Sequence, residues 1–133
     1  MATLFTRIID GEIPGRFVWS DEICVAFLTI EPVQPGHLLV VPRTEVDQWI
    51  DLETQVASHC FEVAARLGRA LRQEFAANRI GLMIQGYEIP HAHLHVWPSM
   101  SSADFDLGSG VSATDAELDE AAGRILARIS DDG

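Results

Sequence analysis

The sequence predicts an α+β fold on a mainly antiparallel sheet. Two observations favour this class: short β-branched and aromatic segments follow one another along the chain, and helical periodicity is confined to separate stretches between and after them. The 133 residues suit one domain with its own core and contain no internal repeat. We therefore expect one compact unit.

The first third of the chain is expected to form a short helix and three strands. Leu4, Phe5, Ile8 and Ile9 have helical spacing, and Asp10-Gly11 ends that helix. The segments FVWSD and ICVAFLTI are rich in β-branched and aromatic residues and are separated by polar residues, which predicts a hairpin. EPVQPG breaks the pattern with two prolines, and HLLVVP is a short buried strand.

The rest of the chain is expected to contain two long helices and two strands. A helix from about residue 52 to 75, with Asp51 as its candidate N-cap, is predicted by apolar residues every three to four positions. IGLMIQG and HAHLHVWP are the two strands. Thr114 followed by Glu117 predicts a capping box that opens a C-terminal helix at about 114–130.

Composition excludes several classes of function. The formal net charge is −11, with 9 Lys and Arg against 20 Asp and Glu, so binding to nucleic-acid backbones is not expected. No apolar run is long enough to span a membrane, and the N-terminus lacks a signal-peptide pattern. Cys24 and Cys60 stand far apart in apolar surroundings, which indicates reduced, buried thiols. We expect a cytoplasmic protein.

Three histidines alternate with apolar residues in PHAHLHVWP. A strand has a side-chain period of two, so His91, His93 and His95 are predicted to share one face. Imidazoles gathered in this way can bind a metal, or they can act on a phosphate, one attacking phosphorus while another protonates the leaving oxygen. A purely structural role is the third interpretation. His37 begins another predicted strand after a Pro-Gly turn, so two histidine-bearing strand ends could meet.

The order LFTRIIDGEIP, FLTIEPVQPGHLLVVPR, PHAHLHVWP resembles the histidine triad (HIT) family, whose signature alternates histidine with hydrophobic residues. The run from His91 to Trp97 matches that signature in full. The resemblance extends from Leu4 to about Pro98 and implies a five-stranded antiparallel sheet with two main helices. We expect residues 1–133 to form a single HIT domain, with the C-terminal helix outside the matched segments. It also implies a homodimer across the long helix. Small residues on that helix, among them Ala64 and Gly68, allow close approach of a neighbour, so we expect a dimer formed through the helix and an edge strand.

The resemblance further implies a nucleotide hydrolase or nucleotidyl transferase. Such a protein cleaves a nucleoside phosphate, either a phosphoramidate or a dinucleoside polyphosphate, at the α-phosphorus through a nucleotidyl-histidine intermediate. His93 would be the nucleophile, His95 the partner of the leaving group, and His91 and His37 a supporting hydrogen-bond network. No metal or other cofactor is expected. The residues expected to contact the nucleotide are Leu4, Phe5, Ile8, Phe27, Thr29, Ile30, Leu39, Gln85 and Glu88.

Some positions depart from the family pattern. Thr29 stands where many relatives carry an acidic residue that can hold ribose hydroxyls. Glu88 stands near the expected phosphate, which it would repel if ionised, although it could donate a proton if its pKa were raised. Thr3, Thr6 and Glu45 replace the thiolate and imidazole ligands with which some bacterial relatives bind a structural zinc ion, so that zinc site is not expected.

Two other classes of function stay open at this point. One is a nucleotide-binding module with little catalysis, which would keep the pocket but show no turnover. The other is a mononuclear metal enzyme that uses the His-x-His-x-His strand.

Overall fold

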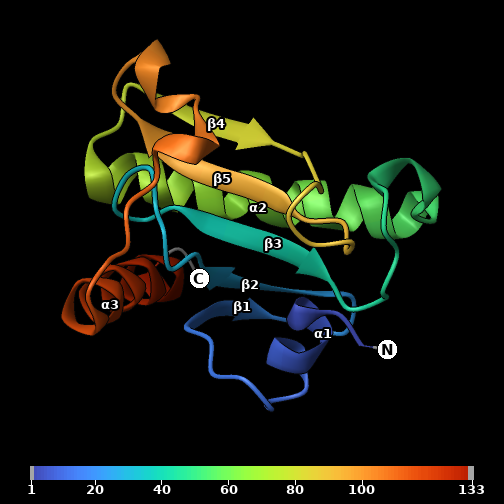
Figure 1. The fold of residues 1–133 in the computed structure, drawn as a ribbon. Coiled ribbons are helices and arrows are strands. Elements are labelled where there is room, and N and C mark those ends of the chain that lie inside the picture. Colours follow the sequence, from blue (N-terminus) through green and yellow to red (C-terminus); the bar gives the residue numbers. More distant parts are fainter. Residues whose placement is uncertain (1, 132–133) are drawn as a thin grey trace.

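The computed structural model describes residues 2–131 and contains one five-stranded antiparallel sheet with strand order β1-β2-β3-β5-β4 (Figure 1). The strands are β1 (Phe17–Ser20), β2 (Cys24–Leu28), β3 (Leu38–Pro42), β4 (Arg79–Met83) and β5 (Leu94–Ser99). The α-helices are α1 (Leu4–Ile9), α2 (Thr54–Phe75) and α3 (Asp115–Asp131). The predicted fold class is confirmed.

The central strands are buried on both faces, and their side chains alternate between two clusters. Leu38 and Val40 of β3 belong to the larger cluster, which includes residues of α2 and α3. Leu39 and Val41 belong to a smaller cluster with residues of α1. Because Leu39 pairs with His95 across the β3–β5 ladder, the histidine face of β5 is the α1 face. The site is thus built between the sheet and the N-terminal helix.

The helices α2 and α3 pack on the same face of the sheet. Leu118 and Ile125 of α3 are buried in the cluster that contains the inner stripe of α2. Arg124 and Arg128 of α3 form ion pairs with Glu74 near the end of α2, at 2.8 and 3.1 Å. Within residues 2–131, no helix is both long and apolar enough to cross a membrane.

The predicted capping box at the start of α3 is present. The Thr114 backbone N–H donates to Glu117 Oε1 at 2.8 Å, and the Glu117 N–H donates to Thr114 Oγ1 at 3.1 Å. The prediction for α2 was wrong at its first turn: Asp51 lies in a 3₁₀ turn, and the helix begins at Thr54 after Glu53 as N-cap.

The strand that carries the histidines begins later than predicted. β5 starts at Leu94, so His91 and His93 precede it. The reason is that the backbone before Leu94 bonds to loops: the N–H of Ala92 donates to the Val46 carbonyl at 2.7 Å. The side-chain alternation survives this change, since Leu94 and Val96 still face the α2 cluster and His95 faces the opposite way.

Candidate active site

A pocket of about 350 Å³ opens between α1, the turn that follows it, the end of β2 and the histidines. Eight of the residues predicted to contact a nucleotide line it with His93 and His95: Leu4, Phe5, Ile8, Phe27, Thr29, Ile30, Leu39 and Glu88. Phe5, Phe27 and Leu39 are buried, whereas Leu4 and Ile30 are 41% and 67% exposed. Exposed apolar side chains at the rim of an apolar pocket are typical of a ligand wall.

Gln85 is not brought into this pocket. It lines a different one with Asp47, Trp49 and Tyr87, and its amide contacts the sulfur of Met83 at 3.4 Å. The turn of β4 into the following loop therefore carries Gln85 away from the histidines.

The turn after α1 contributes lining residues that no sequence motif indicated. Gly15 and Arg16 lie in the pocket wall, as does Glu31 after β2. The signal for the turn is the Pro14-Gly15 pair, which sends the chain back toward the first strand. Arg16 is held by two carboxylates of α3, Asp119 at 2.8 Å and Asp115 at 2.9 Å. These two ion pairs neutralise the charge of the Arg16 guanidinium.

The orientation of His93 is fixed by the backbone. Its Nδ1 lies 2.6 Å from the carbonyl oxygen of His91. A carbonyl oxygen only accepts, so Nδ1 carries a proton and donates, and the neutral ring has its lone pair on Nε2. The ring is fully buried and packs edge-on against Phe5, with centroids 4.8 Å apart. Nε2 is therefore the nitrogen that His93 turns toward the pocket.

A chain of hydrogen bonds assigns the proton of His95. The backbone N–H of Val33 donates to His37 Nδ1 at 3.1 Å, so the proton of neutral His37 is on Nε2. His37 Nε2 lies 3.0 Å from His95 Nδ1, which must accept. His95 therefore presents an N–H at Nε2 toward the pocket. Burial lowers the pKa of His37 to about 3, and a proton on the neighbouring His95 would lower it further, so this ring stays neutral.

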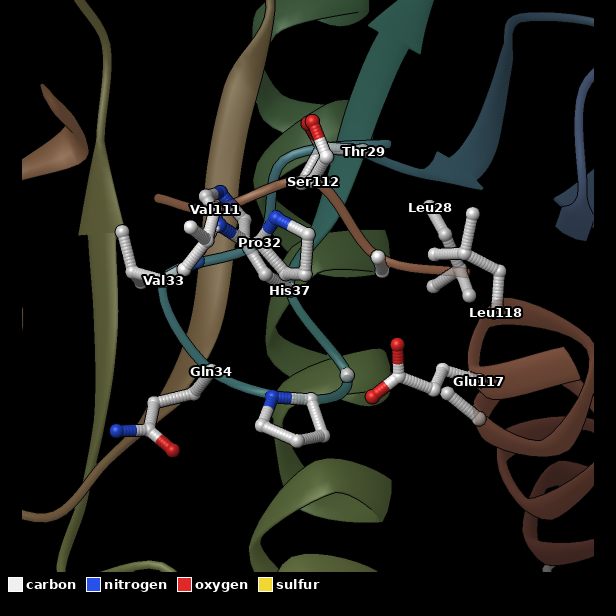
Figure 2. Close-up of a pocket in the computed structure, with 14 residues that line it drawn as sticks. Leu28, Thr29, Pro32, Val33, Gln34, His37, Val111, Ser112, Glu117 and Leu118 are labelled. Atoms are coloured by element: carbon white, nitrogen blue, oxygen red, sulfur yellow. Dashed lines mark hydrogen bonds between the residues drawn. The ribbon is translucent and has the colours of Figure 1, made fainter. Parts of the chain in front are cut away.

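The loop that supplies the Val33 N–H is shown in Figure 2. Residues 32–36 border a second pocket of about 220 Å³, with His37 on its wall and Glu117 and Leu118 of α3 opposite. The loop turns through Gly36, whose φ is +95°, and the His37 N–H closes the turn onto the Gln34 carbonyl at 3.1 Å. The position of the His37–His95 pair therefore depends on this turn.

Gly36→Ala is expected to destabilise the fold by about 1–3 kcal/mol, because it adds a Cβ at a positive φ. That Cβ would lie 2.8 Å from Phe75 Cε2 and 3.1 Å from Leu71 Cδ2. Urea unfolding measures the change. The matched control is Gly123→Ala in α3, where a Cβ has no neighbour within 4 Å and should stabilise the helix. Equal stability of the two variants would contradict this reading of the turn.

His91 does not line the pocket but supports the site through hydrogen bonds. Its Nε2 donates to the Pro42 carbonyl at 2.8 Å, and its Nδ1 accepts from Thr3 Oγ1 at 2.8 Å. Glu45 Oε1 accepts from the Thr3 N–H and from Thr6 Oγ1, at 2.8 and 2.7 Å. Thr3, Thr6 and Glu45, the positions compared with a zinc site, thus form a hydrogen-bonded group that joins α1 to His91. Burial lowers the pKa of His91 despite the Pro42 bond, so the ring is neutral.

Glu88 lies between the two histidines that face the pocket. Its Oε1 is 2.7 Å from His93 Nε2 and 3.2 Å from His95 Nε2. Desolvation raises the pKa of Glu88, but hydrogen bonds from its own N–H, from His93 and from His95 outweigh it and leave the pKa below its ordinary value. The condition under which Glu88 could donate a proton, a raised pKa, is therefore not met.

Two groups of residues place possible metal ligands within 4.8 Å of one another in the described part of the chain. They are Glu88, His93 and His95, and Asp21, Cys24 and His59. In the first group His95 presents a proton at Nε2 rather than a lone pair. In the second, Asp21 already accepts from Trp19 Nε1, His59 Nε2 and two backbone N–H groups at 2.6–2.8 Å. The donor chemistry of both groups fits hydrogen bonding better than metal binding.

These features define a class: an α+β protein in which buried, oriented histidines border an apolar pocket large enough for a small ligand. Residues 10–101 match the model of the HIT domain. The chain belongs to the histidine triad family.

Relatives agree with this assignment. Protein hit from Bacillus subtilis is 31% identical over 106 residues, which are 76% of this chain and 73% of that protein. A bis(5'-nucleosyl)-tetraphosphatase (asymmetrical) from Schizosaccharomyces pombe is 29% identical over 96 residues, 68% of this chain and 52% of the yeast protein. A HIT-like protein from Bartonella henselae superposes with a TM-score of 0.82, at 27% identity and 95% coverage of both chains. Family membership suggests a nucleotide hydrolase or transferase.

Proposed function

We propose that this protein is a nucleotide hydrolase or nucleotidyl transferase that cleaves a nucleoside phosphate at the α-phosphorus, with His93 as nucleophile. The observation that carries the proposal is the pairing of two oriented imidazoles at the pocket. His93 has its proton fixed on Nδ1 by the His91 carbonyl, and His95 presents an N–H at Nε2. One ring can attack phosphorus while the other donates a hydrogen bond to a phosphate or leaving-group oxygen.

The proposed reaction has two displacements. Nε2 of neutral His93 attacks phosphorus, a nitrogen–phosphorus bond forms, and the bond to the leaving oxygen or nitrogen breaks. The leaving atom, hydrogen-bonded by His95, takes its proton from water. Water, or the hydroxyl of an acceptor, then attacks the nucleotidyl-histidine and gives up a proton, which neutralises the hydroxide left by the first step. The nitrogen–phosphorus bond breaks, the nucleotide is released and His93 returns with a free Nε2.

The apolar wall supports a nucleoside as the substrate. Phe27, Ile8 and Leu4 form a surface on which a base can rest, and the histidines lie beyond it. Thr29 at the end of β2 offers one hydroxyl to the ribose, although that oxygen already accepts from the Glu31 N–H at 3.3 Å. We therefore expect recognition of the sugar to be weak.

The test is hydrolysis by the purified protein of a nucleoside phosphoramidate and of a dinucleoside polyphosphate, followed by chromatography of the released nucleotide. Calorimetry with a nucleoside monophosphate is run beside it. Release of a nucleoside monophosphate supports the proposal. Binding without turnover of either substrate would instead identify a nucleotide-binding module.

We also propose that the protein is a homodimer formed through α2 and β4. β4 is an edge strand, and together with α2 it lines a groove of about 300 Å³ that contains Ala64, Gly68 and Ile80. Phe61 and Leu82 at this groove are 55% and 45% exposed. Exposed apolar side chains beside an unpaired strand edge favour association with a second copy.

Phe61→Glu is expected to convert the dimer into a monomer, because it places a charge in the apolar interface. Light scattering at micromolar concentration should give twice the mass of the chain for the wild type and the single mass for the variant. The control is Leu126→Glu on α3, which changes a similarly exposed apolar residue outside the groove. A monomeric wild type would refute the dimer.

A further inference from the structure

We propose that Glu88 is an internal competitor of the substrate's phosphate, holding His93 and His95 until a nucleotide displaces it. This inference rests on the proposed function. It assigns Glu88 a role in controlling access to the phosphate position rather than in the chemical step.

The contact with Glu88 determines where the protons of His93 lie. His93 Nδ1 donates to the His91 carbonyl, so a neutral ring would turn a bare Nε2 toward Glu88. An ionised carboxylate only accepts, and two acceptors do not approach to the observed 2.7 Å without a proton between them. With Glu88 ionised, that proton is on His93 Nε2. The lone pair needed for attack is therefore blocked while Glu88 stays in place.

The carboxylate also occupies the hydrogen bonds that a phosphate would use. The same atom, Oε1, lies 3.2 Å from His95 Nε2, so one anionic oxygen accepts hydrogen bonds from both imidazoles. The arginine in the pocket wall, Arg16, is already paired with Asp115 and Asp119. A phosphate oxygen and the carboxylate oxygen of Glu88 have the same charge sign and the same partners, and they cannot share the position.

The contacts of Glu88 allow it to leave. Its side chain is 45% exposed, and the hydrogen bonds of its carboxylate in the described part of the chain go to the two histidines and to its own N–H. Gly86, two residues before Glu88, has a φ of +86°. A Cβ added at Gly86 would have the Asp47 carbonyl oxygen, 4.0 Å away, as its nearest neighbour. When the carboxylate moves out, it no longer holds a proton on His93 Nε2, and the position between the two imidazoles is open to a phosphate oxygen.

Glu88→Gln tests the proposal, because glutamine keeps the shape and removes the charge. Calorimetry is performed with AMP and GMP, and with adenosine and guanosine, which lack the phosphate. We expect the Kd of the better-bound monophosphate to fall at least ~10-fold in E88Q and that of its nucleoside to stay within ~2-fold. In steady-state hydrolysis of the corresponding phosphoramidate, KM should fall and kcat should not. Glu22→Gln, at the exposed β1–β2 turn, makes the same change in net charge and should alter neither the Kd of the monophosphate nor the KM of the phosphoramidate.

The outcomes separate this inference from the proposed function. Equal affinity of wild type and E88Q for the monophosphate would reject the competitor while leaving the nucleotide site intact. A lower kcat in E88Q would also reject it, since Glu88 would then act in the chemical step. Absence of nucleotide binding in all variants would reject the proposed function and the inference together. Circular dichroism checks that each variant is folded. Glu88→Ala is a second variant without the carboxylate, for the case in which E88Q is not folded.

Discussion

Replacing His93 with alanine is expected to abolish nucleotide release, with a loss of at least ~10³-fold in kcat, because no other group at the phosphate position can form the intermediate. His95 is the nearest imidazole, but its Nε2 carries a proton and its Nδ1 accepts from His37. Chromatographic assay of phosphoramidate hydrolysis measures the loss. Mass spectrometry of acid-sensitive adducts after a rapid quench should detect a nucleotidyl group on the wild type and none on the variant.

The variant should remain folded. His93 is fully buried, so the alanine leaves a small cavity and an unpaired His91 carbonyl, which together cost about 2–4 kcal/mol. Thermal unfolding followed by circular dichroism checks this, and His59→Gln, a histidine change at the Asp21 cluster, serves as a control that keeps turnover. Turnover by H93A at the rate of the wild type would remove His93 from the mechanism.

Much of the fold could be predicted because the relevant signals are local. The alternation in HLLVVP and HAHLHV assigns Leu38, Val40 and Leu94 to one face and His95 to the other, and the structure keeps this assignment. The start of β5 could not be predicted in the same way. It depends on a backbone bond from Ala92 to Val46, a residue distant in sequence, and no periodic pattern reports such a bond.

The candidate site could also be predicted only where the signals are local. The identity of its histidines and most of its apolar wall follow from the motif and the resemblance. The proton positions do not, because they depend on the Val33 N–H and the Pro42 carbonyl, which reach the rings through the tertiary fold. The location of Glu88 between His93 and His95 depends on the path of the loop through Gly86, and the sequence indicates only that a carboxylate lies near the phosphate.

The proton positions change what is expected of His95. The resemblance makes it the partner of the leaving group, and a full proton transfer requires the imidazolium. Burial and the neighbouring His93 lower the pKa of His95, although Glu88 opposes the shift. A second proton would have to sit on Nδ1, where the His37 N–H already donates, and His37 cannot turn its proton around because its Nδ1 accepts from Val33. His95 is therefore fixed as a neutral hydrogen-bond donor.

His95→Asn is accordingly expected to lower kcat by about 10²-fold, since it shortens and misaligns one donor to the charge that develops in the transition state. The loss should be the same, within ~3-fold, for a 4-nitrophenyl ester of a nucleoside monophosphate and for a substrate with a poorly acidic alcohol as leaving group. A nitrophenolate needs no proton to depart, whereas the alkoxide does, so an acid would matter far more to the second substrate. Equal losses follow if His95 stabilises charge without transferring its proton. A loss confined to the alkyl substrate would mean that the His37–His95 pair gains a proton when the nucleotide binds, and that the neutral arrangement belongs to the free protein alone.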